Sequence, residues 1–235
     1  MKFEYESIPV GYYDEVYRKN RGIQSKWHRI KFQALYDLFG ANEKHLDIGC
    51  GAGTLIGSLP GHIHSTGLDI AQSQIDYARR HYGSSTKIFL TAPGGWHVIA
   101  PESFDIVTLI ELIEHLEDDK VVDLLRRSHK ALKLGGRIVV STPDYGGPWL
   151  ALEFLLNRVG NVTYEQQHIN HFTKRRLALT LENAGFRIDM IQRYMFAAPF
   201  LAAVSNSVAD WLNAIEPPFL INRLGFLLLA VGHKR

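Results

Sequence analysis

Short apolar segments alternate with helical patterns through the middle of this 235-residue chain, and no other feature limits its fold as strongly. The apolar segments have the length and character of strands buried on both faces of a sheet. Such alternation is typical of a parallel β-sheet covered by helices on both faces. The predicted strands are 44–48, 62–70, 87–90, 104–110 and 137–141, and the predicted helices between them are 54–59, 71–81 and 118–134.

Further elements flank this alternating core. Residues 10–39 have a helical pattern, and the chain after residue 141 contains predicted helices at 149–156 and 173–184 and predicted strands at 186–195 and 225–231. We predict a single domain over residues 1–235, with residues 1–40 as an N-terminal helical cover. The connections 144–171 and 196–222 are long for a compact domain, and we expect them to form a lid over a ligand site.

Composition excludes several classes of protein. Hydrophobic residues make up 46% of the chain and charged residues 21%, which excludes global disorder. The net charge of +2 makes a dedicated nucleic-acid-binding protein an unfavoured interpretation. The single cysteine excludes an intrachain disulfide and a cysteine-based zinc cluster. The sequence start has no apolar signal segment and no apolar run is long enough to span a bilayer, so we expect a cytoplasmic protein.

The loop after the first predicted strand reads Asp47-Ile48-Gly49-Cys50-Gly51-Ala52-Gly53, and a helical pattern follows it. Alternate glycines let a backbone turn sharply and approach a ligand closely. Dinucleotide-binding folds use G-x-G-x-x-G and place a pyrophosphate at the helix start, whereas this loop is D-x-G-x-G-x-G. A carboxylate inside the turn repels pyrophosphate and suits an ammonium group. The alternative interpretation is a turn needed only for tight strand–helix packing.

A second carboxylate, Asp69, ends the next predicted strand, 22 residues after Asp47. At this place it can accept hydrogen bonds from both hydroxyls of a ribose, as the acid of a dinucleotide fold does. Ile70 follows and can cover one face of a purine ring. Two acids at the ends of adjacent strands disfavour the packing-only interpretation. Together these sequence features predict a ligand that has a ribose, a purine and a cationic amine but no phosphate.

Five stretches of the chain resemble the class I S-adenosylmethionine-dependent methyltransferases, and in particular their ubiquinone-biosynthesis-like O-methyltransferase branch. The resemblance implies an enzyme that uses S-adenosylmethionine. It also implies a Rossmann-like α/β fold: a seven-stranded, mostly parallel sheet with helices on both faces and an antiparallel last strand, here 225–231. The stretches are HLDIGCGAG at 45–53, STGLDIAQSQIDYARR at 65–80, ESFDIVTLIELIEHL at 102–116, ALKLGGRIVVSTP at 131–143 and HFTKRRLALTLENAGF at 171–186.

The resemblance also assigns contacts to the cofactor. It implies that the backbone of the glycine loop holds the methionine part, that Asp69 holds the ribose, and that Glu111 stands beside the methyl donor. This branch usually has an acid near the adenine amine after the third strand, but here that stretch has no carboxylate and leaves backbone groups to make the contact. The expected cofactor-binding residues are Asp47, Gly49, Cys50, Gly51, Asp69, Ile70, Thr91, Ala92 and Glu111.

A carboxylate–histidine motif, Glu111-Leu112-Ile113-Glu114-His115, follows the fourth predicted strand, and we predict that it meets His168 of the later connection. The motif is similar to the E-x-x-E-H pattern of small-RNA 2′-O-methyltransferases, which binds a divalent cation together with a distant histidine. The resemblance implies such a site at Glu111, Glu114, His115 and His168. Carboxylates and imidazoles suit Mg²⁺, Mn²⁺ or a similar ion, which would orient a hydroxyl and lower its pKa.

Two other interpretations of this motif stay open. His115 or His168 can act as a metal-free general base that positions and deprotonates a hydroxyl, with Glu114 beside it. Alternatively, Glu114 and His115 cap the following helix and His168 anchors a loop. We take Glu114, His115 and His168 as the candidate catalytic residues.

The predicted function is methylation of a hydroxyl on a small-molecule acceptor such as a quinol-like, phenolic or glycan-type compound. The E-x-x-E-H motif suggests RNA 2′-O-methylation instead, but the small net charge disfavours a nucleic-acid partner. A protein that binds S-adenosylmethionine without catalysis is a further alternative. The apolar residues of 196–222 suit a lid, a homodimer surface or a site for a membrane-proximal acceptor.

Overall fold

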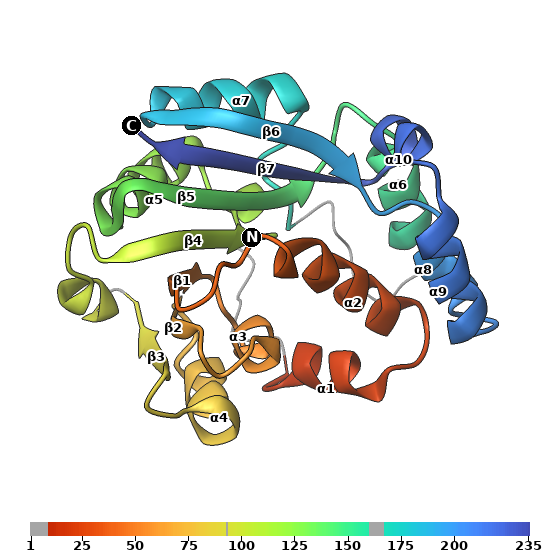
Figure 1. Ribbon diagram of the computed structural model, residues 1–235. Coiled ribbons are helices and arrows are strands. Elements are labelled where there is room, and N and C mark those ends of the chain that lie inside the picture. Colours follow the sequence, from red (N-terminus) through yellow and green to blue (C-terminus); the bar gives the residue numbers. More distant parts are fainter. Residues whose placement is uncertain (1–8, 93, 160–166) are drawn as a thin grey trace. The chain divides into compact units, whose positions relative to one another are not determined.

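A computed structural model describes residues 9–92, 94–159 and 167–235 of the chain (Figure 1). The first eight residues of the predicted N-terminal cover and residues 160–166 of the predicted insertion lie outside the described residues. Seven strands form one sheet in the order β3-β2-β1-β4-β5-β7-β6. The chain divides into two compact units. Among the described residues, one comprises Pro101–Tyr194 and Pro218–Arg235, and the other comprises 9–100 and Met195–Pro217.

The unit that begins the chain contains three parallel strands, β1 (Lys44–Ile48), β2 (His64–Asp69) and β3 (Lys87–Thr91). The helices α3 (Thr54–Ser58) and α4 (Gln72–Tyr82) connect them. These elements confirm the predicted β-α alternation. The core beside the strands contains side chains from the loop after β1, from both helices and from β3, namely Cys50, Ile56, Ile75, Ala78 and Phe89.

The helical pattern predicted over 10–39 corresponds to two helices, α1 (Tyr12–Lys19) and α2 (Ile23–Tyr36). Asn20 has φ 48° and Gly22 has φ 84°, so the backbone reverses between the two helices. Asparagine and glycine adopt this left-handed conformation more readily than other residues.

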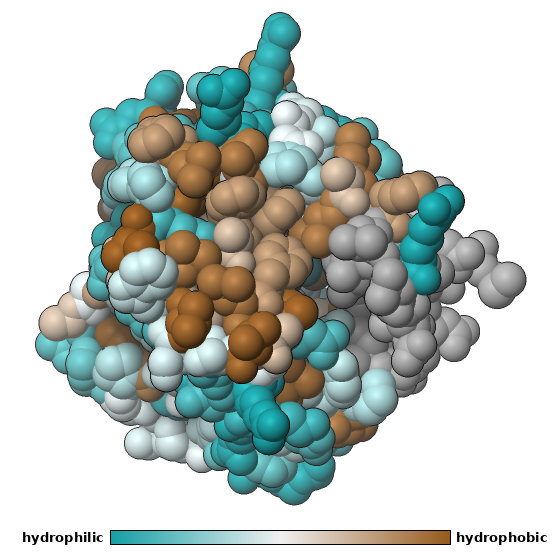
Figure 2. Space-filling view, turned by 90° about the vertical axis from the view of Figure 1, so that its right-hand side faces the viewer, coloured by the Kyte–Doolittle hydropathy of each residue, from teal (hydrophilic) through white to brown (hydrophobic). Residues whose placement is uncertain are grey.

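The insertion after β6 forms α8 (Ala198–Leu201) and α9 (Asn206–Ile215) within the same unit. Lys26 Nζ on α2 and Asp210 Oδ1 on α9 lie 2.6 Å apart, and Trp27 of α2 meets Phe200 of α8 edge to face. The outward side of α9 is apolar, since Trp211 is 62% exposed. Figure 2 shows many apolar side chains gathered on this side of the molecule, where α8 and α9 lie in Figure 1.

The second unit contains β4 (Phe104–Ile110), β5 (Leu132–Pro143), β6 (Phe186–Tyr194) and β7 (Leu227–Lys234). β4 pairs with β5 in parallel, whereas β7 pairs antiparallel with both β5 and β6. This arrangement confirms the antiparallel last strand. In Figure 1, α7 runs along β6. The helices of this unit are α5 (Asp118–Ala131), α6 (Trp149–Val159), α7 (Lys174–Asn183) and α10 (Pro218–Leu224).

One predicted boundary in this unit is wrong. We expected a helix over 118–134 that stops at Gly135-Gly136, but α5 ends at Ala131 and β5 already begins at Leu132. The pairing register with β4 shifts between Phe104 and Ile106, and Gly135 has φ 74° at this irregularity. Phe104 pairs with Leu132 and Ile106 pairs with Arg137, so this left-handed glycine lies inside an irregular part of β5 and not at a helix end. The start predicted for α7 is confirmed, because the Thr173 side chain accepts a hydrogen bond from Arg176 N.

Among the described residues, no helix combines the length and the apolar character needed to cross a membrane.

Candidate cofactor loop and carboxylate–histidine cluster

The glycine loop connects the end of β1 to the start of α3, as predicted. Gly51 has φ 50°, and a Cβ added to it would meet nothing within 4 Å, so open space lies beside this backbone. Gly53 differs, because a Cβ there would lie 2.6 Å from the ring of Phe89. The loop therefore combines a packing glycine with a glycine that leaves room for a ligand to approach the backbone.

The N–H groups of the loop are engaged within the protein. Gly49 N and Cys50 N donate to Leu68 O at 2.7 and 3.2 Å, and Gly51 N donates to Asp69 Oδ2 at 2.8 Å. Loops that bind phosphate aim such N–H groups at the ligand. Here these three donors fix the turn itself. The buried carboxylate of Asp47 lies immediately before the loop. This chemistry fits an ammonium group better than a phosphate.

Asp69 ends β2 and holds two backbone groups. Its Oδ2 accepts from Gly51 N, and its Oδ1 accepts from Ala71 N at 2.9 Å. Burial raises the pKa of Asp69, and the backbone hydrogen bonds oppose that rise. A carboxylate has about four lone-pair positions, so each oxygen can accept one further hydrogen bond. The residue is therefore suited to accept hydrogen bonds from two neighbouring ribose hydroxyls.

The Cys50 side chain packs into the core beside β3. Burial, followed by the nearby Asp47 and Asp69 carboxylates, raises the pKa of the thiol well above its ordinary value. A protonated, buried thiol is neither a nucleophile nor a metal ligand. Any contact of Cys50 with a cofactor would therefore come from its backbone.

The residues predicted to contact the adenosine lie around the ends of β2 and β3. Ile70 is 62% exposed, as a side chain that covers a purine must be before the ligand binds. Thr91 Oγ1 donates to Gln72 Oε1 at 2.7 Å. Ala92 N donates to Asp69 O at 2.7 Å, so this N–H is already engaged, and a contact between this segment and adenine stays a prediction for its other groups.

Glu111 follows β4 directly and has a left-handed backbone, with φ 52°. Its N–H donates to Ser141 O at 2.9 Å, which fixes it against the neighbouring strand β5. A left-handed conformation of a non-glycine residue costs about 1–3 kcal/mol and is concentrated at functional sites. The place of this residue, at the carboxyl end of a central strand, is where ligands bind in open α/β sheets.

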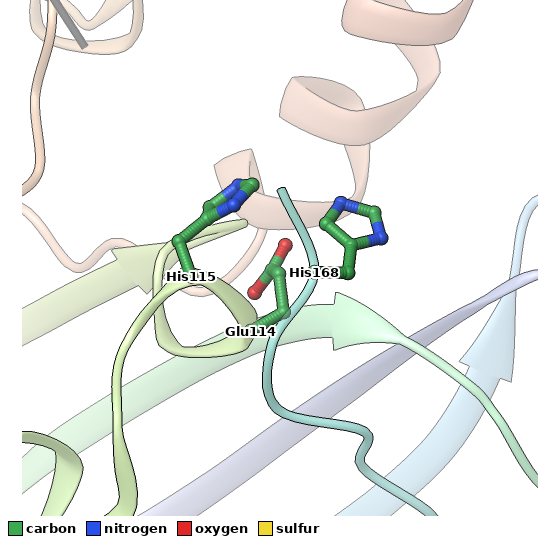
Figure 3. Close-up of side chains that lie close together, drawn as sticks. All are labelled: Glu114, His115 and His168. Carbon is green, nitrogen blue, oxygen red and sulfur yellow. The ribbon is translucent and has the colours of Figure 1, made fainter. Parts of the chain in front are cut away.

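Three residues of the predicted motif lie together, and we refer to Glu114, His115 and His168 as the carboxylate–histidine cluster (Figure 3). Each offers one ligand atom, and these atoms lie within 4.8 Å of one another. Figure 3 shows the Glu114 carboxylate between the two imidazoles. Glu114 and His115 lie on the 3-10 helix Ile113–His115 after β4, and His168 lies in the connection before α7. Glu111, the fourth residue implied for a cation, is not in this group.

Hydrogen bonds orient two members of the cluster. His115 Nδ1 lies 2.9 Å from Gln167 O. Because a carbonyl oxygen can only accept, Nδ1 carries the hydrogen and Nε2 carries the lone pair. Thr142 Oγ1 donates to Glu114 Oε2 at 3.0 Å, and Asn170 N donates to Glu114 O at 3.0 Å. The 3-10 helix is thereby fixed both to β5 and to the connection that carries His168.

Sequence reasoning missed two residues that contact His168. Tyr145 OH lies 2.9 Å from His168 Nδ1, and Glu153 Oε1 lies 3.3 Å from the same nitrogen. Tyr145 OH also donates to Glu153 Oε1 at 3.1 Å. A signal for each was present in the sequence. Tyr145 follows the carboxyl end of β5, and Glu153 is an acid within the apolar stretch WLALEFLL.

The cluster is held in its neutral imidazole forms. Burial, followed by repulsion from His115 and His171, lowers the pKa of His168 to about 3. Burial also lowers the pKa of His115, although the hydrogen bond to Gln167 and the Glu111 charge oppose that shift. Both rings are therefore uncharged near neutral pH and carry a lone pair, as a metal ligand or a hydrogen-bond acceptor requires.

Comparison with known proteins identifies the family. A family model described as a methyltransferase domain matches residues 18–190, which is most of the chain. The chain belongs to this methyltransferase family. The match includes the glycine loop, Asp69, the cluster and most of the sheet, and it accords with the resemblance inferred from the sequence.

Two curated relatives of this methyltransferase are named for the same activity. The ubiquinone biosynthesis O-methyltransferase of Idiomarina loihiensis is 34% identical over 193 residues, which are 77% of this chain and 76% of the relative. The protein of the same name from Aeromonas salmonicida is 29% identical over 160 residues, 64% of this chain and 65% of the relative. The similarity is therefore distant, and in the second protein it spans just under two thirds of the length.

Solved structures share the fold of this methyltransferase over almost its whole length. A structure from Thermotoga maritima, described as an S-adenosylmethionine-dependent methyltransferase and possible histamine N-methyltransferase, has a TM-score of 0.69 at 18% identity and covers 98% of each chain. An S-adenosylmethionine-dependent methyltransferase from Archaeoglobus fulgidus has a TM-score of 0.65 at 21% identity, over 95% of this chain and 100% of that one. These structures establish the Rossmann-like class I methyltransferase fold.

Proposed function

We propose that this methyltransferase transfers the methyl group of S-adenosylmethionine to a hydroxyl group of a small molecule. The main support for a small-molecule hydroxyl as the acceptor is the similarity to the ubiquinone biosynthesis O-methyltransferase of Idiomarina loihiensis, which spans about three quarters of both chains. The small net charge of +2 supports a small acceptor over RNA. The name of the Thermotoga maritima protein concerns an amine acceptor, but that likeness reflects the fold alone.

We assign cofactor binding to the glycine loop and to the ends of β2 and β3. In this proposal Asp47 and the loop carbonyls receive the ammonium group, Asp69 receives the ribose hydroxyls, and Ile70 covers the purine. The engaged N–H groups of the loop and the open space at Gly51 support this ligand. The assigned residues are Asp47, Gly49, Cys50, Gly51, Asp69, Ile70, Thr91, Ala92 and Glu111.

Bound S-adenosylmethionine supplies an electrophilic methyl group on its sulfonium. The acceptor oxygen forms the new C–O bond as the C–S bond breaks, and the hydroxyl proton leaves. Alignment of the two groups supplies much of such a rate enhancement. In this proposal Glu114, His115 and His168 receive and orient the hydroxyl and accept its proton. Their neutral imidazoles and their buried carboxylate are the groups that support this role.

We further propose that the carboxylate–histidine cluster holds a divalent cation. Two imidazoles and a carboxylate are a donor set for ions such as Mn²⁺ or Fe²⁺. Two donors that each lie about 2.1 Å from an ion are at most about 4.2 Å apart, so the cluster would close only slightly around it.

Both insertions, 144–171 and 196–222, present exposed apolar side chains, Leu150 and Phe154 on α6 and Trp211 and Ile215 on α9. We propose that those of 196–222 form a lid, a homodimer surface or a site for a membrane-proximal acceptor, and that those of α6 bind the apolar part of the acceptor. A quinol-like or phenolic acceptor would use them, whereas a simple sugar would not.

The acceptor test uses a panel of phenols, quinols, glycans, amines and small RNAs with a labelled methyl donor. We expect label in phenols or quinols, with loss of activity in Asp69→Ala and unchanged activity in the exposed control Asp76→Ala. Transfer to RNA alone, or to amines alone, would contradict the proposed acceptor class. Calorimetry with S-adenosylmethionine that finds equal binding by Asp69→Ala and the wild type would contradict the cofactor assignment.

The cation is tested with Mn²⁺ titration of the wild type, of His168→Ala and of the exposed control His62→Ala. We expect the wild type and the control to bind one ion and His168→Ala to lose it. A chelator should lower the rate of methyl transfer without changing the affinity for S-adenosylmethionine. Full activity in the presence of chelator would remove the cation from the proposal and leave the O-methyltransferase assignment in place.

A further inference from the structure

We infer that Tyr145 and Glu153 are positioning residues that fix the tautomer and the orientation of His168. The inference deepens the proposed function, because it concerns how one member of the cluster is presented. It rests on that function only for the consequence in catalysis. The tautomer itself is a property of the resting protein and can be measured without turnover.

The three groups lie in mutual contact, and the phenol makes a hydrogen bond to each of the other two. Tyr145 OH lies 2.9 Å from His168 Nδ1 and 3.1 Å from Glu153 Oε1, and Glu153 Oε1 lies 3.3 Å from the same Nδ1. Because the carboxylate can only accept, the phenol donates its hydrogen to Glu153. The Nδ1 atom then meets two oxygens that accept, so it must carry the hydrogen. The lone pair of the ring therefore resides on Nε2.

The direction of the ring matters as much as its tautomer. Figure 3 shows Nε2 of His168 on the side of the ring that faces His115, while Nδ1 points away from it. The two imidazole centroids lie 5.0 Å apart. A lone pair on Nε2 is thus directed into the cluster, where a ligand or an acceptor proton would be received. The opposite tautomer would place a hydrogen at that position instead.

Burial makes this set of contacts selective. His168 is 5% exposed and Glu153 is 7% exposed. In such surroundings the attraction between a carboxylate and an imidazole N–H is stronger than at the surface, and the wrong tautomer would leave Glu153 facing a ring lone pair. The indole of Trp149 packs near the same ring, with centroids 5.8 Å apart, which further limits its rotation.

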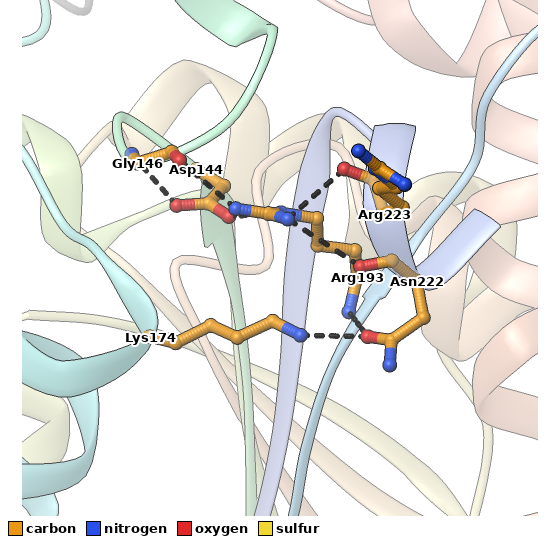
Figure 4. Close-up of polar contacts among 6 residues, drawn as sticks. All are labelled: Asp144, Gly146, Lys174, Arg193, Asn222 and Arg223. Atoms are coloured by element: carbon orange, nitrogen blue, oxygen red, sulfur yellow. Dashed lines mark hydrogen bonds and ion pairs between the residues drawn. The ribbon is translucent and has the colours of Figure 1, made fainter. Parts of the chain in front are cut away.

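Tyr145 is itself fixed by a polar clamp, defined as Asp144, Gly146, Arg193 and Asn222 (Figure 4). Asp144 Oδ1 accepts from Gly146 N at 2.8 Å, and the other carboxylate oxygen accepts from Arg193 Nε. Arg193 also donates to Gly146 O at 2.9 Å. Hydrogen bonds thereby hold the turn on both sides of Tyr145.

Two further contacts hold Tyr145 from the opposite side. Its N–H donates to Phe172 O at 2.8 Å, and its ring stacks on His171 at a centroid distance of 4.0 Å. Phe172 and His171 belong to the same connection that carries His168. The phenol therefore links the end of β5 to this connection as one fixed arrangement.

The test reads the tautomer directly from long-range ¹H–¹⁵N correlation spectra of the histidine rings. We expect the His168 signals of the wild type to show hydrogen on Nδ1. In Glu153→Gln and in Tyr145→Phe they should move towards a mixture of tautomers. Tyr77→Phe is the matched control, because it removes another phenol that donates to a carboxylate, Asp14, at 2.9 Å. Unchanged His168 signals in both variants would overturn the inference, whatever their activity.

The catalytic consequence is a fall in kcat of about 10- to 100-fold in each variant, the range found when a partner that orients a metal-ligating histidine is removed. KM for S-adenosylmethionine should stay at the wild-type value, and kcat is calculated per folded enzyme as measured by circular dichroism, because an unfolded fraction lowers the apparent kcat without changing KM. If the two variants change the His168 tautomer but the wild type does not methylate hydroxyl groups, the inference is supported and the proposed function is contradicted. If both variants methylate hydroxyl groups normally and keep the His168 signals of the wild type, the proposed function is supported and the inference is contradicted.

Discussion

The carboxylate of Asp144 is fully buried and pairs with Arg193, whose guanidinium also reaches three backbone carbonyls, those of Gly146, Asn222 and Arg223. One side chain of β6 thus joins the turn after β5 to the end of α10. Asp144 accepts from Nε of Arg193, and the three carbonyls accept from its Nη1 and Nη2 atoms. Further hydrogen bonds therefore surround the ion pair. Such an arrangement compensates the cost of burying charge, and either partner alone would be strongly destabilising.

Replacement of Arg193 by methionine should therefore lower the free energy of unfolding by about 3–5 kcal/mol, because Asp144 would remain buried without its cation. Urea unfolding of Arg193→Met measures this loss, with Arg187→Met on the same strand as the control. Arg187 is 60% exposed and pairs with Asp189, so its removal should cost no more than about 1 kcal/mol. Equal losses in the two variants would show that the clamp contributes no more than a surface ion pair.

Two glycines of the cofactor loop should respond differently to alanine. Gly51→Ala places a methyl group in open space, so the free energy of unfolding should fall only by the cost of a left-handed alanine, about 1–2 kcal/mol. Binding of S-adenosylmethionine should nevertheless weaken strongly, since the methyl group occupies the space offered to the ligand. Gly53→Ala would press against Phe89 and Ala78 and should destabilise more. Thermal unfolding and calorimetry on both variants separate the two effects, and a Gly51→Ala protein with normal affinity would contradict the assigned cradle.

Stability should fall in acid partly because of His45, which is fully buried and contacts Ser65 Oγ at 3.1 Å. Burial lowers the pKa of His45 to about 3 from an ordinary value of 6.5. Between these values the unfolded chain binds a proton that the folded protein does not. The free energy of unfolding should thus decrease as the pH falls through this window, by up to about 1.4 kcal/mol per pH unit.

The variant His45→Asn keeps a hydrogen-bonding group near Ser65 and removes the titration. Its free energy of unfolding, measured by urea between pH 7 and pH 4, should depend on pH less steeply than that of the wild type. The difference between the two slopes isolates this one residue from the other buried histidines. Identical slopes would mean that His45 titrates normally in the folded protein.

Cys50 should be unreactive in the folded protein, because its thiol is buried and the pKa of that thiol is raised. We expect iodoacetamide to leave native protein unmodified over hours and to alkylate the single cysteine at once in denaturant. Rapid alkylation of native protein, at a rate equal to that of a small free thiol, would show that the loop opens. The control is the same reaction on Cys50→Ser, which must give no adduct.

Strands were the easiest part of the fold to predict. The predicted strand 104–110 coincides with β4 because a strand buried on both faces is an uninterrupted apolar run. The glycines were the hardest residues to interpret, since Gly135 lies in an irregular part of β5 and not at the end of a helix. A glycine with positive φ serves both purposes, and only the pairing of Leu132 with Phe104 distinguishes them.

The candidate site residues, too, could be predicted from the sequence only in part. Glu114, His115 and His168 could be selected from the sequence because two of them are adjacent and the third has a motif-like spacing. Tyr145 and Glu153 could not, because their partnership depends on how α6 returns beside the end of β5. Glu153 was nonetheless visible as a lone acid in an apolar helix, and a buried charge of that kind has a partner that only the fold can reveal.

The hydrogen bonds inside the glycine loop have a consequence for discrimination among the nucleotides of a cell. Those bonds occupy the N–H groups of Gly49, Cys50 and Gly51 before any ligand arrives. A dinucleotide or a nucleoside triphosphate needs such donors for its phosphates and would also meet the negative charge of Asp47. We therefore expect the loop to disfavour adenine nucleotides that carry phosphates, and this expected selectivity would be a property of the empty protein as much as of the bound complex.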